Sequence, residues 1–329
     1  MKSILIVHQG AIGDFVLSLP ALEALHRSYP EAHFTFLARP NILELIQARP
    51  YVKDVLDFSA SRWAVLYDLQ GRVASADLER LLPVDIIFIF GRSSSQIVAD
   101  NLARNFGKPT HRLDPFPKPG LGLSLVVHQC RQLEELGIPA SPPPAAIIAP
   151  RHQDLVEARS FVRCNMAPEE SLILLHPGSG GRNKLWTPLG WVRLIHKLAV
   201  YPNLRIALLQ GPADNQIVQQ IRSRLDSISP MLVENWPLGK LAALMTEAAL
   251  YLGNDSGITH LAAACGTATI ALFGPTDLQI WAPRGPQVRI IHWKPGSSAN
   301  NLQGESGKIS KSAPEVALVW DQVRDWLEL

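Results

Sequence analysis

The chain alternates short apolar runs with longer amphipathic segments, an order typical of α/β proteins. Residues 3–8 read as an apolar, β-branched strand, and residues 15–29 carry apolar side chains at helical spacing. Residues 33–38 follow as the next expected strand. A strand, helix and strand of this length predict a right-handed crossover and a parallel sheet. We therefore expect an open α/β domain in the first half.

The rest of the first half is less regular. The tract 108–122 is so rich in proline and glycine that we expect a surface loop there. Residues 138–144 (IPASPPP) form a stiff, extended spacer. The expected short strands are 55–58, 64–68 and 85–90.

The second half repeats the architecture, so the sequence predicts two domains. The first spans residues 1–150, with a linker at about 138–150, and the second spans residues 151–329. The expected strands of the second half are 172–176, 205–210, 251–253, 269–273 and 288–293. The expected helices are 188–198, 215–225, 238–248, 258–265 and a terminal helix at 313–327. The polar segment 297–311 lies just before this terminal helix, and its sequence suggests no function.

Composition narrows the class of protein. The chain has 329 residues, of which 47% are hydrophobic, and a net charge of +2, which argues against nucleic acid as a partner. Its three scattered cysteines fit a reducing cytosol. We find no signal peptide, and no apolar run approaches the ~20 residues of a membrane span. These features predict a cytoplasmic protein that can still work at a membrane surface.

Three polar glycine turns follow expected strands, where ligands of open α/β sheets bind. The first contains Gly10, Gly13 and Asp14, in a G-x-x-G spacing that is not a dinucleotide fingerprint. The second strand also ends in Arg39 instead of the acid that would hold a ribose, which disfavours a nicotinamide oxidoreductase. Asp14 is either a helix cap or a general base, and the local pattern alone favours the cap.

The second turn, HPGSGGRNKLW, runs from His176 to Trp186. It departs from the Walker pattern, because Asn183 replaces the last glycine and Leu185 replaces the Ser or Thr. Successive glycine amides beside Lys184 nevertheless suit a diphosphate. A flexible, solvated loop is the alternative.

The third turn contains Asp255, Ser256 and Gly257, with His260 one helical turn further on. A helix start after a parallel strand is suited to a phosphate or pyrophosphate, although Asp255 or Ser256 can also act simply as a cap. A serine-hydrolase elbow is excluded, since the flanking glycines are missing. A lone histidine such as His260 is more often a core or capping residue. The ten histidines show no metal-binding spacing.

Taken in order, these turns resemble glycosyltransferase family 9, the ADP-heptose:lipopolysaccharide heptosyltransferases. The likeness covers nearly the whole chain. The motifs that carry it are G-x-x-G-D-x-x-x-x-x-P (Gly10 to Pro20), H-P-G-S-G-G-x-x-K-x-W (His176 to Trp186) and G-N-D-S-G-x-x-H-L-A-A-A followed by F-G-P-T-D (Gly253 to Asp277).

The resemblance implies a GT-B fold, in which two Rossmann-like domains face each other across a cleft and helix 313–327 packs back on the first domain. It makes Asp14 the base that takes the acceptor proton, with Gly10 and Gly13 in an acceptor-side loop. The implied contacts to the donor diphosphate and sugar are Ser179, Gly180, Lys184, Asp255, Ser256, Gly257 and His260. The implied contacts to the ribose and base are Asp214, Trp236 and Leu238.

The implied activity is inverting transfer of a heptose or related sugar from an ADP-sugar to a lipopolysaccharide-core or similar acceptor. No metal and no cofactor are expected, because an ammonium, glycine amides and a helix N-terminus can neutralise the leaving diphosphate. The expected partners are a nucleotide-sugar donor and a glycolipid or glycan, with peripheral contact at the cytoplasmic face of the inner membrane. A transferase for another nucleotide sugar or acceptor, and a catalytically silent nucleotide-sugar-binding protein, are the alternatives.

Overall fold

The computed structural model describes residues 2–118, 120–144, 147–293 and 314–329. These residues form two compact units. Unit 1 comprises Met1–Arg151 with Pro237–Gly239, and unit 2 comprises His152–Trp236 with Lys240–Leu329. The predicted segment 297–311 lies outside the described residues. No helix in the described part of the chain combines the length and apolar character that crossing a bilayer requires.

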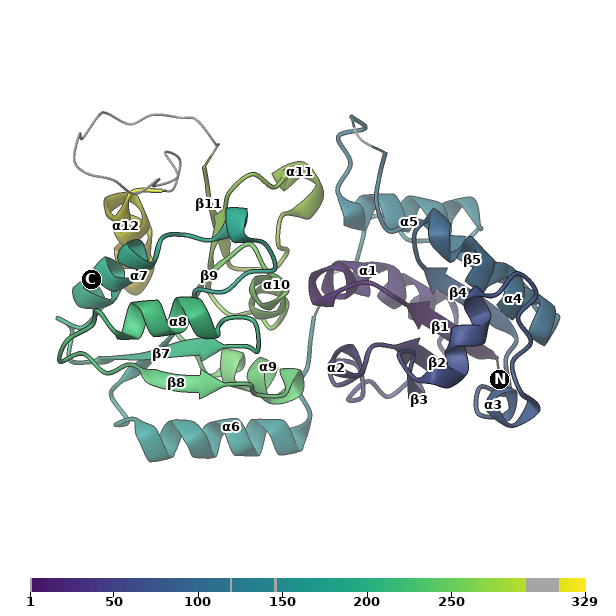
Figure 1. The fold of residues 1–329 in the computed structure, drawn as a ribbon, viewed down its shortest axis with the longest axis horizontal. Helices are drawn as coiled ribbons and strands as arrows, with labels where there is room; N and C mark the ends of the chain where they lie inside the picture. Colours follow the sequence, from purple (N-terminus) through teal and green to yellow (C-terminus); the bar gives the residue numbers. More distant parts are fainter. Residues whose placement is uncertain (1, 119, 145–146, 294–313) are drawn as a thin grey trace. The chain divides into compact units, whose positions relative to one another are not determined.

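Unit 1 is built on a five-stranded parallel sheet in the order β3-β2-β1-β4-β5 (Figure 1). Its strands are β1 (Ser3–His8), β2 (His33–Ala38), β3 (Val52–Asp57), β4 (Ile86–Phe90) and β5 (Thr110–Leu113). Its helices are α1 (Ile12–Ser28), α2 (Pro40–Leu43), α3 (Ser75–Glu79), α4 (Gln96–Phe106) and α5 (Leu125–Glu135), with 3-10 helices η1 (Ser61–Tyr67) and η2 (Ser93–Ser95).

Two expectations for unit 1 are wrong. Of the residues expected as a strand at 64–68, those from 64 to 67 belong to the 3-10 helix η1, in which Trp63 and Leu66 bury side chains three residues apart on one side. The tract 108–122, expected as a loop, contains β5, which pairs with β4. Because β5 is an edge strand flanked by Pro109 and Pro115, the prolines remove no hydrogen bond inside the sheet.

Unit 2 is built on a six-stranded parallel sheet in the order β11-β10-β9-β6-β7-β8. Its strands are β6 (Ser171–His176), β7 (Leu204–Gln210), β8 (Met231–Glu234), β9 (Leu250–Asn254), β10 (Thr269–Phe273) and β11 (Val288–His292). Its helices are α6 (His152–Asn165), α7 (Pro188–Leu198), α8 (Asn215–Arg222), α9 (Leu238–Thr246), α10 (Gly257–Ala264), α11 (Leu278–Trp281) and α12 (Val316–Leu327), with the 3-10 helix η3 (Arg182–Lys184). The sequence analysis missed α6, β8 and α11.

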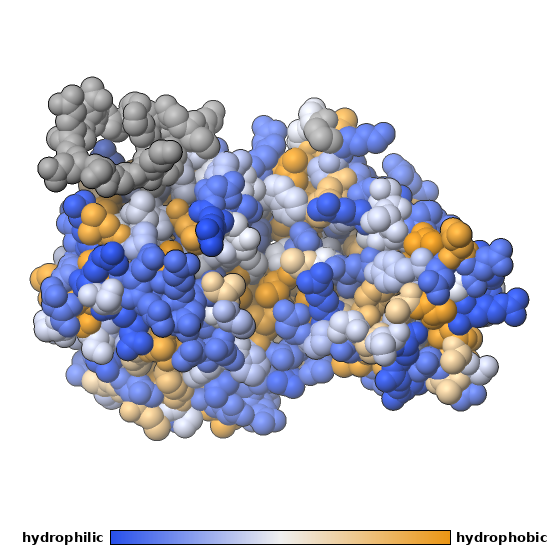
Figure 2. Space-filling view, in the orientation of Figure 1, coloured by the Kyte–Doolittle hydropathy of each residue, from blue (hydrophilic) through white to orange (hydrophobic). Residues whose placement is uncertain are grey.

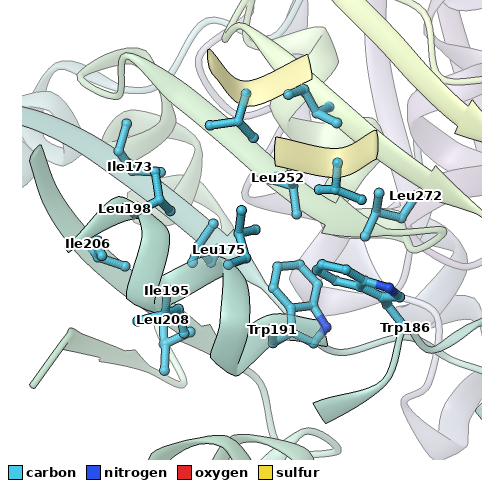
Figure 3. Packing of buried hydrophobic residues seen from close by; sticks show 14 of the residues in the cluster. Ile173, Leu175, Trp186, Trp191, Ile195, Leu198, Ile206, Leu208, Leu252 and Leu272 are labelled. Carbon is cyan, nitrogen blue, oxygen red and sulfur yellow. The ribbon is translucent and has the colours of Figure 1, made fainter. Parts of the chain in front are cut away.

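The core of unit 2 lies between the sheet and helices α7, α8 and α12. Figure 3 shows aliphatic side chains of the strands packed around two indole rings, those of Trp186 and Trp191. The two ring centroids are 5.2 Å apart in an edge-to-face arrangement, which adds stabilisation beyond the buried area. Trp186 is 1% exposed, so the end of the predicted diphosphate turn is anchored in the core.

The terminal helix α12 contributes Val319 and Val323 to this core and contacts α7. Its apolar face is thus occupied within unit 2. The packing of this helix on the first domain stays a prediction. Away from the core, polar side chains cover most of the visible face of unit 2, and apolar ones occur in small groups (Figure 2).

Candidate functional site

The order of strands in unit 2 places two of the predicted turns next to each other. From β6 the chain builds the sheet toward β7 and β8, and it then returns to add β9, β10 and β11 on the other side. The direction of winding therefore reverses between β6 and β9, which pair directly. Ligands of open α/β sheets bind at the carboxyl ends of strands at such a switch point. The second and third turns leave from these two ends.

Direct contacts join the two turns. The Lys184 ammonium lies 2.9 Å from Oδ2 of Asp255, and the Ser179 hydroxyl donates to the backbone carbonyl of Asp255 at 2.6 Å. Asp255 Oδ2 also accepts a hydrogen bond from the Thr276 hydroxyl. The Asp255 side chain is 6% exposed and that of Lys184 is 34% exposed. The buried Asp255 carboxylate thus holds the partly exposed Lys184 ammonium between the two turns.

The third turn opens helix α10 as a capped N-terminus. Ser256 is the N-cap residue, and its hydroxyl accepts a hydrogen bond from the Thr259 N–H at 3.4 Å. The first turn of a helix presents unpaired N–H groups and a partial positive charge, and Gly257 begins this turn. The predicted cap and the predicted anion site therefore coincide in one element.

His260 lies in the same helix and is 4% exposed. Burial lowers its pKa to about 4, although the Asp255 carboxylate acts in the opposite direction. The ring is therefore neutral at physiological pH. Its Nδ1 is buried without a hydrogen-bond partner among the described residues.

Asp214 is turned toward the protein interior. Its Oδ2 lies 3.2 Å from Nε2 of His176 and accepts the Gly211 N–H at 2.8 Å. Burial alone would raise the pKa of Asp214, but the hydrogen bond and the charge interaction with His176 lower it below its ordinary value. His176 also faces Ser256, with 3.3 Å between its Nδ1 and the Ser256 hydroxyl. The Asp214 carboxylate therefore packs against the second turn from the interior of the protein. Its contact with a ribose stays a prediction.

The other two predicted base contacts follow β8 in the chain. Trp236 follows β8, two strands from β6, where its ring meets Phe161 edge-to-face and lies under the Lys240 ammonium. Leu238 is the first residue of α9 and is 8% exposed. Their contacts with an adenine stay predictions.

Gly178 is the position in the second turn with the least room. A Cβ at Gly178 would lie 2.0 Å from Oδ1 of Asp214, whereas one at Gly180 would meet no atom within 4 Å. We expect Gly178→Ala to lower the melting temperature by several degrees, because the turn must lift off a buried, hydrogen-bonded carboxylate. Gly180→Ala is the matched control and should melt like the unaltered protein in differential scanning calorimetry. Equal melting temperatures for the two variants would contradict this packing.

The first turn lies in unit 1, between β1 and α1. Asp14 is the third residue of α1, and its Oδ2 accepts the Ala11 N–H at 3.0 Å. The cap that the local pattern favoured is therefore present. A Cβ at Gly10 would lie 2.7 Å from Cβ of Asp14 and 2.9 Å from the His8 ring, so this turn also requires glycine. Gly13, the other predicted loop residue, is partly buried within the first turn of α1.

A cavity of about 740 Å³ opens beside this turn at the carboxyl ends of β1, β2 and β3. Its lining includes Gln9, Arg39, Phe58, Ser61, Trp63 and Tyr67. The Gln9 carboxamide is fixed by Tyr67 at 3.1 Å and by the Ser95 hydroxyl at 2.6 Å. Aromatic faces beside a few placed polar groups are typical of a small-molecule pocket. The sequence analysis missed this pocket, because it read η1 as a strand.

Two buried histidines predict how stability depends on pH. Burial lowers the pKa of His8 from 6.5 to about 3 and that of His260 from 6.5 to about 4. Below pH 6.5 these two histidines bind protons in the unfolded chain but stay neutral in the folded chain. Their contribution to stability is therefore intact above pH 6.5 and falls as the pH drops. Each histidine contributes up to about 1.4 kcal/mol per pH unit until its folded pKa is reached.

We therefore expect the free energy of unfolding, measured by urea titration from pH 7 to pH 4, to decrease. His260→Gln should make the decrease shallower, since glutamine has no proton to gain. An unchanged slope in that variant would contradict the assignment.

The chain is similar to known proteins in both its sequence and its fold. The family model described as glycosyltransferase family 9 (heptosyltransferase) matches residues 58–306. The lipopolysaccharide core heptosyltransferase OpsX of Haemophilus influenzae is 22% identical over 326 residues, covering 95% of this chain and 89% of that protein.

Two solved structures share the fold. E. coli ADP-heptose lps heptosyltransferase II is 17% identical, with a TM-score of 0.71 over 99% of this chain and 98% of that one. E. coli heptosyltransferase WaaC with ADP is also 17% identical, with a TM-score of 0.69 over 99% and 100% of the two chains. The predicted α/β architecture of two Rossmann-like, parallel-sheet domains of the GT-B type is thereby confirmed.

Proposed function

The chain belongs to glycosyltransferase family 9, and from that premise we propose that it transfers a heptose or related sugar from an ADP-sugar to a lipopolysaccharide-core or similar glycan. One observation carries the proposal. The second and third turns meet at the switch point of unit 2, where Lys184 lies 2.9 Å from Asp255 beside the N-terminus of α10. Both solved structures named above are of heptosyltransferases, and one of them holds ADP.

On the donor side, the diphosphate would be bound by the backbone amides of Ser179, Gly180 and Gly257 and by the Lys184 ammonium, while the Ser179 hydroxyl stays on the Asp255 carbonyl. Breaking the bond between sugar and diphosphate leaves negative charge on the diphosphate oxygens. Hydrogen-bond donors arranged in advance around the diphosphate would stabilise this charge as it develops. This supports transfer without a metal or other cofactor. Asp255, Ser256 and neutral His260 would then border the sugar.

On the acceptor side, Asp14 would act as the general base. Its carboxylate stands at the start of α1, in the turn after β1 from which Gln9 reaches the cavity of unit 1, and that cavity would offer a site for a glycan. A single carboxylate suffices, since it removes the proton of the attacking hydroxyl as the new bond forms. Direct attack from the face opposite the diphosphate inverts the anomeric centre.

The same proposal gives the partners and the place of action. OpsX is named as a lipopolysaccharide core heptosyltransferase, which supports a glycolipid acceptor and action at the cytoplasmic face of the inner membrane. Contact there would be peripheral. Nucleic acid is not a partner in this proposal, in line with the net charge of +2.

Incubation with ADP-, UDP-, GDP- and CDP-sugars and a lipopolysaccharide-core acceptor tests the function. We expect ADP release and a new glycosidic bond only with ADP-heptose or a close relative, inverted at the anomeric carbon and unaffected by EDTA. Transfer from another nucleotide sugar would establish the first alternative function. Binding without transfer or hydrolysis would establish a catalytically silent protein.

A further inference from the structure

The side chain of Asn254 bridges the two ends of the second turn. Asn254 is the last residue of β9 and is fully buried, with 0% of its surface exposed. Its Nδ2 donates to the backbone carbonyl of Pro177 at 2.7 Å, and its Oδ1 accepts the backbone N–H of Trp186 at 3.0 Å. One carboxamide thus closes the loop from residue 177 to residue 186.

The loop closed in this way has little regular structure to define its path. It contains three glycines, and its regular structure is the single 3-10 turn η3. Glycine-rich segments lose much conformational entropy when they are ordered. The Trp186 end is held independently, because its indole Nε1 donates to the Pro314 carbonyl at 2.9 Å and its ring packs on Trp191. Asn254 ties the Pro177 end to that fixed point.

The residues that follow Asn254 reach the same loop. Asp255 binds Ser179 and Lys184, and Ser256 faces His176. The position of Lys184 over the start of α10 therefore depends on how the loop is held against β9. We propose that Asn254 is a positioning residue for the donor site: it presets the loop so that Lys184 and the glycine amides face the N-terminus of α10. This rests on the proposed function, in which that loop binds the donor diphosphate.

The residue type matters because Asn254 must donate to a carbonyl and accept from an amide at once. A carboxylate of the same shape can accept from the Trp186 N–H but has no hydrogen for the Pro177 carbonyl. It would also add a buried negative charge beside Asp255. Asn254→Asp therefore loosens one end of the loop without removing side-chain volume.

ADP binding to the full-length protein, measured by isothermal titration calorimetry, tests the proposal. We expect the Kd for ADP to rise about ten- to a hundredfold in Asn254→Asp, the loss that follows from an unmade buried hydrogen bond. At saturating donor the transfer rate should change much less than KM, since Asn254 does not touch the reacting atoms.

Asn101 supplies the matched control. It is also 0% exposed, and its Nδ2 donates to the carbonyls of Leu66 at 2.9 Å and Asp68 at 2.7 Å within unit 1. Asn101→Asp makes the same chemical change in the same degree of burial, with the one difference that Oδ1 of Asn101 accepts from the Arg104 guanidinium at 2.5 Å. It should lower the melting temperature while leaving the Kd for ADP unchanged. If both variants lose ADP affinity equally, the effect is general destabilisation and the proposal is overturned.

Hydrogen exchange in the unaltered protein gives a test that needs no variant to fold. A preset loop requires the Trp186 backbone amide to exchange as slowly without ADP as with it. Free exchange until ADP is added would overturn the proposal, as would an Asn254→Asp protein that binds ADP normally. Failure of the unaltered protein to bind ADP would instead refute the proposed donor site.

Discussion

Asp14→Asn is expected to lower the rate of sugar transfer about 10²- to 10⁴-fold, the range in which a positioned general base contributes. A carboxamide cannot take the proton of the attacking hydroxyl. The cap should survive, because the Asn oxygen can still accept the Ala11 N–H that Oδ2 of Asp14 accepts at 3.0 Å. Melting temperature and ADP affinity should therefore match those of the unaltered protein. Initial rates at saturating donor and acceptor, with calorimetric ADP binding on the same samples, measure the effect.

Glu23→Gln is the matched control for removing an acid from the same helix. Glu23 lies on α1, where its carboxylate pairs with Arg27 and Arg49 at the surface. Losing such a pair changes stability by about 1 kcal/mol at most and should leave transfer intact. An Asp14→Asn enzyme that turns over as fast as Glu23→Gln would show that Asp14 is only a cap, as its local sequence suggested.

Hydrophobic periodicity was sufficient to predict the strands that carry the site. The runs at 3–8, 172–176 and 269–273 are fully or almost fully buried in the two sheets, so most of their residues are apolar and polar ones occur only at their ends. The polar turns after β1, β6 and β9 could be found because a parallel sheet collects its strand ends at one edge. Lys184, Asp255 and Ser256 are brought together accordingly.

Side-chain pairing could not be predicted in the same way. Periodicity indicates which face of an element is buried, but not which distant residue a polar side chain meets. The pattern gave no indication that Asp214 pairs with His176, which lies 38 residues earlier in the chain, and its contact with a ribose stays a prediction. The role of Asn254 could not be predicted either, because its partners Pro177 and Trp186 lie more than sixty residues away in the chain. The cavity of unit 1 was missed for a related reason, because Trp63 and Tyr67 lie on a 3-10 helix that resembles a strand in sequence.

Lys184→Met is expected to weaken ADP binding about ten- to a hundredfold, because a hydrogen bond to a charged group contributes about 1.5–3 kcal/mol. The loss in kcat/KM for transfer should be larger, about 10²- to 10³-fold. Negative charge on the diphosphate grows toward the transition state, and the ammonium interacts with it most strongly there. Calorimetry with ADP and initial rates over a range of donor concentrations measure the two effects.

Arg182→Met is the control for overall charge. Arg182 is an exposed cation in the same turn, two residues from Lys184. If only the general positive potential of the turn mattered, both variants would lose similar affinity, and this loss would fall as salt is added. We expect Arg182→Met to bind ADP within about threefold of the unaltered protein, since an exposed charge contributes roughly 1 kcal/mol or less. Equal losses would contradict a specific role for Lys184.

A double variant separates the contribution of Lys184 to folding from its contribution to binding. In Lys184→Met the Asp255 carboxylate, 6% exposed, loses the cation at 2.9 Å and keeps the Thr276 hydroxyl. Leaving a buried charge without its partner destabilises the fold, so the melting temperature should fall. Adding Asp255→Asn removes that charge and should recover most of the melting temperature. ADP binding should stay weak, because the ammonium that neutralises the diphosphate is still missing. Recovery of ADP affinity in the double variant would mean that Lys184 acts only by balancing Asp255.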